Sequence, residues 1–241
     1  LQAALNNGET NIVLMDNITL TESIVVPASA ATTYSLRTAA TVIDLNGKTI
    51  TGNMHKNDGS VIKNEGNLVL MNGTVSSIAN NGGSAIANNG TLTVKNATLN
   101  GAPNANGSWP SYSVNNTGIM TVENTTITSY HGAVASYGDG AVVTLNNCTI
   151  DMAGIPGFTS HGIYTYNNGK VVVNGGTYEN KATDQNASGA SVINGAVEVN
   201  AGTFSGRIEN YYGTPVLKGG IFSVKPNTKY TFPVFSLVMF S

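Results

Sequence analysis

The sequence predicts an all-β fold: a right-handed parallel β-helix, or solenoid, built from one chain, with about nine coils and a short N-terminal helical cap. Composition is the first observation behind this prediction. Asn (32 residues), Gly (28) and Thr (28) dominate the 241 residues, and all three have low helix propensity. The second observation is a repeat of about 25 residues, in which apolar and polar side chains alternate as they do in half-buried strands.

The repeat is clearest in two pairs of segments. Gly90–Leu99 (GTLTVKNATL) matches Gly118–Ile127 (GIMTVENTTI), and Gly169–Tyr178 (GKVVVNGGTY) matches Gly195–Phe204 (GAVEVNAGTF). Each copy contains a threonine that serves as the anchor of the alignment. The anchors are Thr19, Thr49, Thr74, Thr98, Thr126, Thr149, Thr177 and Thr203, with Ile221 in a degenerate ninth copy.

Three columns of this alignment are apolar. The column six residues before the anchor contains Val13, Ile43, Leu68, Leu92, Met120, Val143, Val171, Val197 and Pro215. The column four before it contains Met15, Leu45, Leu70, Val94, Val122, Leu145, Val173, Val199 and Leu217. The column one after it contains Leu20, Ile50, Val75, Leu99, Ile127, Ile150, Tyr178, Phe204 and Phe222. A unit this small cannot bury its own apolar face, so we expect stacked units to enclose these columns in a tube.

Each unit is expected to contain three short strands. Two residues before the anchor, every copy has Asn or Gly except one, which has Ala201. Asn and Gly adopt positive φ at low cost, so this column predicts a bend between two strands. A weaker apolar segment precedes each copy, for example Ser60–Lys63 and Gly132–Ala135, and predicts the third strand.

We expect a single domain over residues 1–241. Residues 1–10 form the N-terminal cap, in which Leu1–Asn6 reads as a short helix closed by an Asn-Gly pair. Residues 11–224 form the coils. Residues 225–241 break the repeat and end in an apolar tail, which we expect either to cap the last coil or to contact a partner chain. A chain that begins at Leu1 suggests a mature form or a piece of a longer protein.

Charge and cysteine content argue against several classes of partner. Only 10% of residues are charged and the net charge is −2, whereas a nucleic-acid-binding protein needs a basic face. The longest apolar run, Phe232–Phe240, is too short for a membrane span. The single cysteine, Cys148, cannot form an intrachain disulfide or a cysteine metal site. We expect no nucleic acid, membrane span, metal or cofactor.

The sequence resembles the pectin-lyase-like right-handed parallel β-helix superfamily, and within it the Asn/Gly/Thr-rich repeat proteins of bacterial surfaces and phage particles. The likeness lies in the opening LQAAL, in Asp44–Gly52 (DLNGKTITG) and in the Gly-Gly-Thr-Tyr/Phe endings. It implies an extracellular location on a bacterial cell surface or virion and, as in phage spikes, a homotrimer through the tail. It selects no single function, because this scaffold carries lyases, hydrolases, adhesins and viral spikes.

Acidic residues are sparse for an enzyme. A glycosidase needs two carboxylates about 5–10 Å apart, but the closest acidic pair in sequence is Glu179 and Asp184, and neither arginine lies in a lyase-like motif. Lys95 and Glu123 are expected to form a cross-strand ion pair. We therefore predict no catalytic residue, and we keep a polysaccharide lyase or glycoside hydrolase as an alternative.

Two histidines stand out. His131 and His161 each precede a glycine on consecutive coils, and we expect them on the same face, one step apart in register. Together with Asp139 or Asp151 they could ligate a metal or act as acid and base. The reading we favour is two surface turn residues.

Aromatic residues gather in or beside the weaker strand in the second half of the chain. They are Trp109, Tyr112, Tyr130, Tyr137, Tyr164, Tyr166, Tyr211 and Tyr212. An exposed strip of this kind could stack on sugar rings while Asn, Ser and His bond the hydroxyls. The alternative is ordinary packing. We predict a non-catalytic, surface-exposed protein that binds glycan or is adhesive through these residues and the two histidines, and a structural spacer remains a further alternative.

Overall fold

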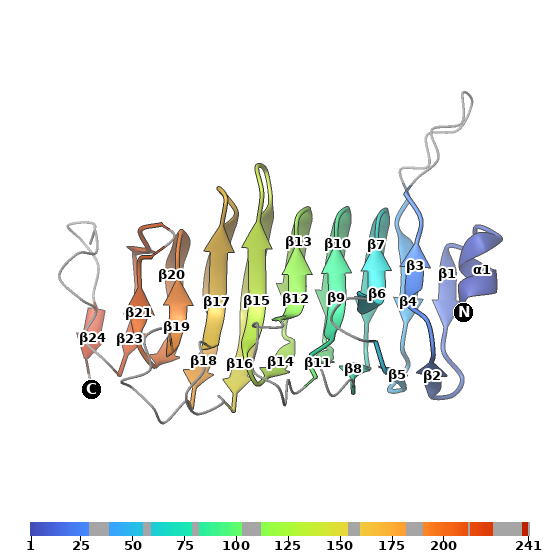
Figure 1. Cartoon of the computed structure of the whole chain (residues 1–241), viewed down its shortest axis with the longest axis horizontal. Helices are drawn as coiled ribbons and strands as arrows, with labels where there is room; N and C mark the ends of the chain where they lie inside the picture. Colours follow the sequence, from blue (N-terminus) through green and yellow to red (C-terminus); the bar gives the residue numbers. More distant parts are fainter. Residues whose placement is uncertain are drawn as a thin grey trace.

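The computed structural model describes residues 1–28, 39–54, 59–78, 82–102, 112–153, 160–181, 190–211, 213–223 and 238–240. It shows a parallel β-solenoid, as predicted (Figure 1). Every pairing among the described strands is parallel, and each strand pairs with the equivalent strand of a neighbouring coil. The strands form two sheets, of sixteen and eight strands.

The chain contains one described helix, α1 (Gln2–Asn6). The larger sheet contains β1 (Asn11–Val13), β2 (Ile18–Leu20), β4 (Thr41–Asp44), β5 (Thr49–Gly52), β7 (Asn67–Met71), β8 (Thr74–Ser77), β10 (Thr91–Lys95), β11 (Thr98–Asn100), β13 (Ile119–Glu123), β14 (Thr126–Ser129), β16 (Val142–Met152), β18 (Lys170–Asn180), β20 (Val197–Ser205), β22 (Val216–Leu217), β23 (Gly220–Phe222) and β24 (Val238–Phe240). The smaller sheet contains β3 (Ile24–Val26), β6 (Ser60–Asn64), β9 (Ser84–Asn88), β12 (Tyr112–Asn116), β15 (Gly132–Tyr137), β17 (Ser160–Tyr166), β19 (Ala190–Asn194) and β21 (Ile208–Glu209).

From the second coil onward the three predicted apolar columns lie in the core. Leu92, for example, pairs with Leu68 on one side and Met120 on the other, and all three side chains are buried. Parallel pairing places equivalent residues of successive coils next to one another, so a column of the alignment becomes a continuous apolar stack. The column after the anchor ends in stacked aromatic rings, with 4.8 Å between the centroids of Tyr178 and Phe204.

The predicted inward face is wrong in the first copy of the repeat. Val13 and Met15, expected inside, are 54% and 81% exposed. Ile12 pairs with the core residue Ile43 instead, and Ile18 pairs with Ile50. Residues 12–15 are all apolar, so the alternation of apolar and polar side chains does not show which of them face inward. The turn that follows is also one residue shorter than in the second copy.

The bends form largely where they were predicted. The expected bend residues with positive φ, between 46° and 95°, are Gly47, Asn72, Asn96, Asn124, Asn147 and Gly175. Asn17 and Gly219 do not have positive φ. The misfit at Ala201 is resolved by a register shift, which places Ala201 opposite Asn174 and moves the positive φ to Gly202. A residue without a Cβ therefore still occupies the strained position.

A ladder of buried asparagines lines the corner between the smaller sheet and the next coil. The side-chain amide of Asn64 donates to Asn88 Oδ1, and that of Asn88 donates to Asn116 Oδ1, each over 2.7 Å. All three side chains are fully buried. The apolar alternation does not predict this ladder, although a recurring Asn-x-Gly in these copies is a signal for it.

The predicted exposed ion pair is confirmed. Lys95 Nζ lies 3.1 Å from Glu123 Oε2 on neighbouring strands, and such exposed pairs contribute little to stability. Cys148 is buried, and its thiol contacts the Val122 carbonyl oxygen at 3.3 Å. Burial raises the pKa of the Cys148 thiol to about 11, so at neutral pH it is an unreactive thiol that fills space in the core.

The two ends of the solenoid differ. At the N-terminal end α1 lies beside the first coil (Figure 1). There the Gln2 side chain bonds the backbone of β3. Its side-chain oxygen accepts from the Val25 N–H over 2.8 Å and its amide donates to the Val25 carbonyl over 3.0 Å. The buried Leu5 packs into the same end. No helix in the described part of the chain is long and apolar enough to span a membrane.

At the C-terminal end, part of the tail adds one more strand. Val238 pairs with Gly220, and Phe240 pairs with Phe222, so β24 continues the ladder of the coils. The rest of the tail lies outside the described residues, and a trimer through it stays a prediction. The solenoid has about six turns, fewer than the nine coils predicted.

Candidate functional site

Four of the eight predicted aromatic residues lie in strands of the smaller sheet. Tyr112 begins β12, Tyr137 ends β15, and Tyr164 and Tyr166 lie in β17. Because Ile163 and Thr165 are buried, alternation along the strand turns the two tyrosines of β17 toward the outer face. Trp109 and Tyr212 lie outside the described residues.

Three of the predicted residues form a packed cluster. The Tyr164 ring stacks against Tyr112, with centroids 5.5 Å apart, and against His161, with centroids 5.4 Å apart. Tyr112 is only 7% exposed and His161 only 4%. Gly132 lies beneath the Tyr112 ring, and a Cβ at that position would overlap the ring. Tyr112 and His161 therefore present no open face to a ligand and act in packing.

The histidines are not surface turn residues, because both side chains are almost completely buried. Their predicted register is correct. Gly132 is the residue that pairs with His161, and His131 directly precedes Gly132. His161 Nδ1 and the Ser191 hydroxyl share a buried hydrogen bond of 2.8 Å. The described residues contain no group of three or more His, Cys, Asp or Glu side chains placed to hold a metal ion.

The acidic residues that were candidates to assist the histidines have other partners. Asp139 accepts a 2.7 Å hydrogen bond from the Asn168 amide, and Asp151 lies 2.7 Å from Lys181 Nζ. Glu179 lies 3.6 Å from the same lysine, and its sequence neighbour Asp184 is outside the described residues. The described carboxylates therefore do not converge on the two histidines.

Acid is expected to weaken the fold through His161. Burial lowers the pKa of His161 from 6.5 to about 4, so the unfolded chain binds this proton more tightly than the folded protein does. The contribution to stability is complete above pH 6.5 and is lost as the pH falls toward 4, by about 3 kcal/mol in all. Urea denaturation at pH 7.5 and pH 4.5 measures the loss. His161→Phe should remove this part of the pH dependence, and an unchanged dependence in that variant would contradict the assignment.

Three other tyrosines lie outside this cluster, and we call them the tyrosine row: the half-buried Tyr137 and the exposed Tyr166 and Tyr211. Tyr137 pairs with Tyr166 across neighbouring strands. Tyr166 is 43% exposed and Tyr211 is 80% exposed. The buried side of the Tyr166 ring faces Tyr164, with 6.4 Å between centroids and 16° between ring planes. The packed cluster thus supports the Tyr166 ring.

The third member of the row is placed by the backbone. The Tyr211 N–H donates to Asn194 Oδ1 over 3.1 Å, directly after the pairing of Asn194 with Glu209. After Asn194 the chain turns into β20, where Val197 pairs with Val171. Tyr130 is also exposed, but it precedes β15 and so lies about 20 Å along the strand from Tyr137.

Polar groups flank the row. The exposed turn after Tyr166 contains Asn167 and Asn168, both with positive φ, and Asn168 bonds Asp139. The Gly138 N–H donates to the Tyr166 carbonyl over 3.2 Å. This hydrogen bond links the turn after β17 to the turn after β15. Amide and carboxylate groups are therefore held at the edge of aromatic rings, an arrangement suited to a ligand with an apolar face and many hydroxyls.

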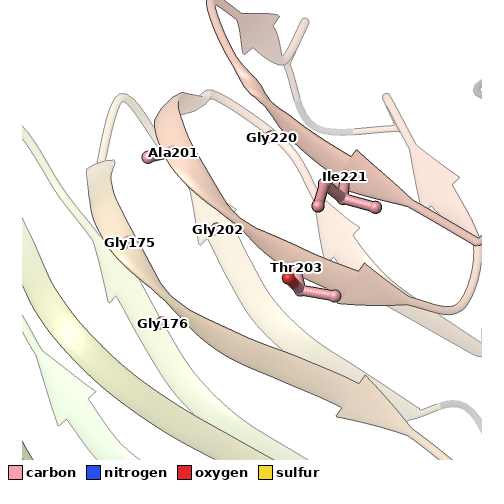
Figure 2. Close-up of a pocket in the computed structure, with 7 residues that line it drawn as sticks. All are labelled: Gly175, Gly176, Ala201, Gly202, Thr203, Gly220 and Ile221. Carbon is pink, nitrogen blue, oxygen red and sulfur yellow. The ribbon is translucent and has the colours of Figure 1, made fainter. Parts of the chain in front are cut away.

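A shallow groove lies elsewhere, at the bend of β18, β20 and β23 (Figure 2). Its lining residues are Gly175, Gly176, Ala201, Gly202, Thr203, Gly220 and Ile221. Among these described residues the only side-chain polar group is the Thr203 hydroxyl, and none is titratable. The groove arises because glycines replace the asparagines found at the bends of earlier coils.

Comparison with known proteins adds no family: no family model matches the chain, and neither the curated proteins nor the solved structures contain a significant match. The parallel β-solenoid follows from strand pairing alone. Membership of the pectin-lyase-like superfamily remains an interpretation of the sequence.

Proposed function

We propose that this protein is a non-catalytic β-solenoid exposed on a bacterial cell surface or a virion, where it binds glycan through the tyrosine row. The observation that carries the proposal is the pairing of exposed Tyr166 with Tyr137 on adjacent strands, beside the hydrogen-bonded Asp139 and Asn168. The C–H face of a sugar packs on an aromatic ring, and its hydroxyls need donors and acceptors at the ring edge. The extracellular location rests on the sequence resemblance.

The scaffold favours such binding because it holds the rings before a ligand arrives. Tyr166 packs on the Tyr164 ring, which is itself held by Tyr112 and His161. Ordering a flexible side chain on binding costs about 0.5–1.5 kcal/mol, and rings that are already ordered avoid much of that cost. A purely structural spacer has no comparable reason to expose aromatic rings in a row.

Affinity measurements on tyrosine variants test the proposal. A polysaccharide array identifies a bound glycan, and titration then compares the wild type with Tyr166→Ala and Tyr211→Ala. Each substitution should weaken binding about tenfold, the loss of one stacking contact. Tyr130→Ala is the matched control, because Tyr130 is 40% exposed but lies outside the row.

Three outcomes would overturn the proposal. Failure to bind any polysaccharide, or equal affinity in all variants, would favour the structural spacer. Release of reducing ends or unsaturated uronates from a polysaccharide panel would favour the carbohydrate-active enzyme.

A further inference from the structure

We propose that His161 is a positioning residue for the tyrosine row: acting through Tyr164, it keeps the exposed Tyr166 ring ordered at neutral pH, and this support is lost in acid. The proposal rests on the proposed function, because it concerns the regulation of the same site. It follows from three properties of His161: its ring contacts, its burial and the groups that surround it.

Two ring stacks connect His161 to the row. The His161 and Tyr164 ring planes are only 11° apart, with centroids 5.4 Å from each other. Tyr164 in turn stacks on Tyr166, which is 43% exposed. Because His161 is only 4% exposed, it does not itself present a surface to a bound glycan. A movement of its ring reaches the row by changing the surface on which Tyr164, and through it Tyr166, packs.

Hydrogen bonds hold His161 in this position at neutral pH. Its Nδ1 and the Ser191 hydroxyl of β19 share the 2.8 Å bond, and its backbone N–H donates to the His131 carbonyl over 2.8 Å. From β18, the Asn180 amide donates to the Ser191 carbonyl over 2.9 Å and to the Ser160 hydroxyl over 3.2 Å. These partners are all uncharged oxygen or nitrogen groups of the backbone or of Ser and Asn.

The titratable and charged side chains on the neighbouring elements give the His161 ring no counter-charge in the part of the chain that the structure describes. The acidic ones have other partners, since Asp139 bonds Asn168, and Asp151 and Glu179 lie 2.7 and 3.6 Å from Lys181 Nζ. The others are His131, Tyr112, Tyr137 and Tyr164. The face of the Tyr164 ring attracts a cation, but the loss of water outweighs this attraction, because burial lowers the pKa of His161 to about 4.

Acid therefore favours an open state, in which the His161 ring has left the cluster and reached water. There the imidazole regains a pKa of 6.5, against about 4 in the closed cluster, so the ratio of open to closed molecules rises roughly 70-fold between pH 7.5 and pH 4.5. In the open state a glycan must order the tyrosine rings as it binds. We expect this to weaken binding by about two- to tenfold, the cost of ordering one such side chain.

Proton NMR of the full chain, titrated from pH 7.5 to pH 4, tests the connection without a ligand. The ring resonances of Tyr164 and Tyr166 should move with those of the His161 imidazole, while the far-UV circular dichroism of the sheets stays constant. In His161→Phe the tyrosine resonances should not move. Tyrosine resonances that ignore the His161 titration, or that move only as the sheet signal is lost, overturn the proposal, and the wild type alone shows this if His161→Phe does not fold.

Titration calorimetry with cellohexaose and mannohexaose at pH 7.5 and pH 4.5 measures the consequence for binding. With the probe that binds, the wild type and Asp139→Asn should both lose affinity in acid, and His161→Phe should lose none. A loss that persists in His161→Phe and disappears in Asp139→Asn assigns the effect to the carboxylate and overturns the proposal, leaving glycan binding intact. If no glycan on the array binds, the proposed function fails, and the NMR titration still decides whether His161 positions Tyr166.

Discussion

Leu145→Asp should abolish the cooperative folded state. Leu145 is fully buried in β16, where it pairs with Val122 of β13 and Val173 of β18. A carboxylate in this stack has no partner, and burying it costs several kcal/mol on top of the lost packing. The free energy of unfolding of a domain is typically about 5–15 kcal/mol, so one such change removes most of it. Far-UV circular dichroism and urea denaturation would measure the loss.

The neighbouring residue supplies the control. Thr144 precedes Leu145 and faces outward, where it pairs with Thr121. Thr144→Lys should change the free energy of unfolding by no more than about 0.5 kcal/mol, because a half-exposed lysine keeps its head group in water. Similar losses in the two variants would show that the inward assignment of this strand is wrong.

Asn88→Leu should cost about 4 kcal/mol, the second largest effect that we expect. Leucine has a similar volume, so the loss reports hydrogen bonds more than cavity formation. The Asn88 amide donates to Asn116 Oδ1 over 2.7 Å and to the carbonyls of Gly90 and Ile119 over 3.1 and 3.2 Å. Its oxygen accepts from Asn64 over 2.7 Å. Substitution leaves these buried partners unsatisfied, at about 1–3 kcal/mol for each group that finds no replacement.

The adjacent asparagine is the matched control for the ladder. Asn89 is exposed, and its amide bonds Glu65 Oε1 over 2.9 Å at the surface. Water can replace that bond, so Asn89→Leu should cost less than about 1 kcal/mol in the same urea experiment. A comparable loss at the two positions would mean that the buried ladder adds no special stability.

The histidines and tyrosines show where prediction from sequence ends. The clustering of Tyr112, His161, Tyr164 and Tyr166 on successive coils was visible in the repeat, and the structure does bring these four rings together. Which of them face solvent was not visible. That outcome depends on neighbours in other coils, such as Gly132, whose missing side chain lets the Tyr112 ring lie flat and reach Tyr164.

The sequence by itself determined the solenoid and its core from the second coil onward. Period-two alternation assigns the inward face, and parallel stacking repeats that assignment in every copy. It failed in the first copy because Ile12 and Val13 are both apolar, and there the pairing of Ile12 with Ile43 made the choice. Only the tertiary structure separated a packed cluster from the tyrosine row among the aromatic residues, because exposure depends on what covers a side chain, and residues distant in sequence provide that cover.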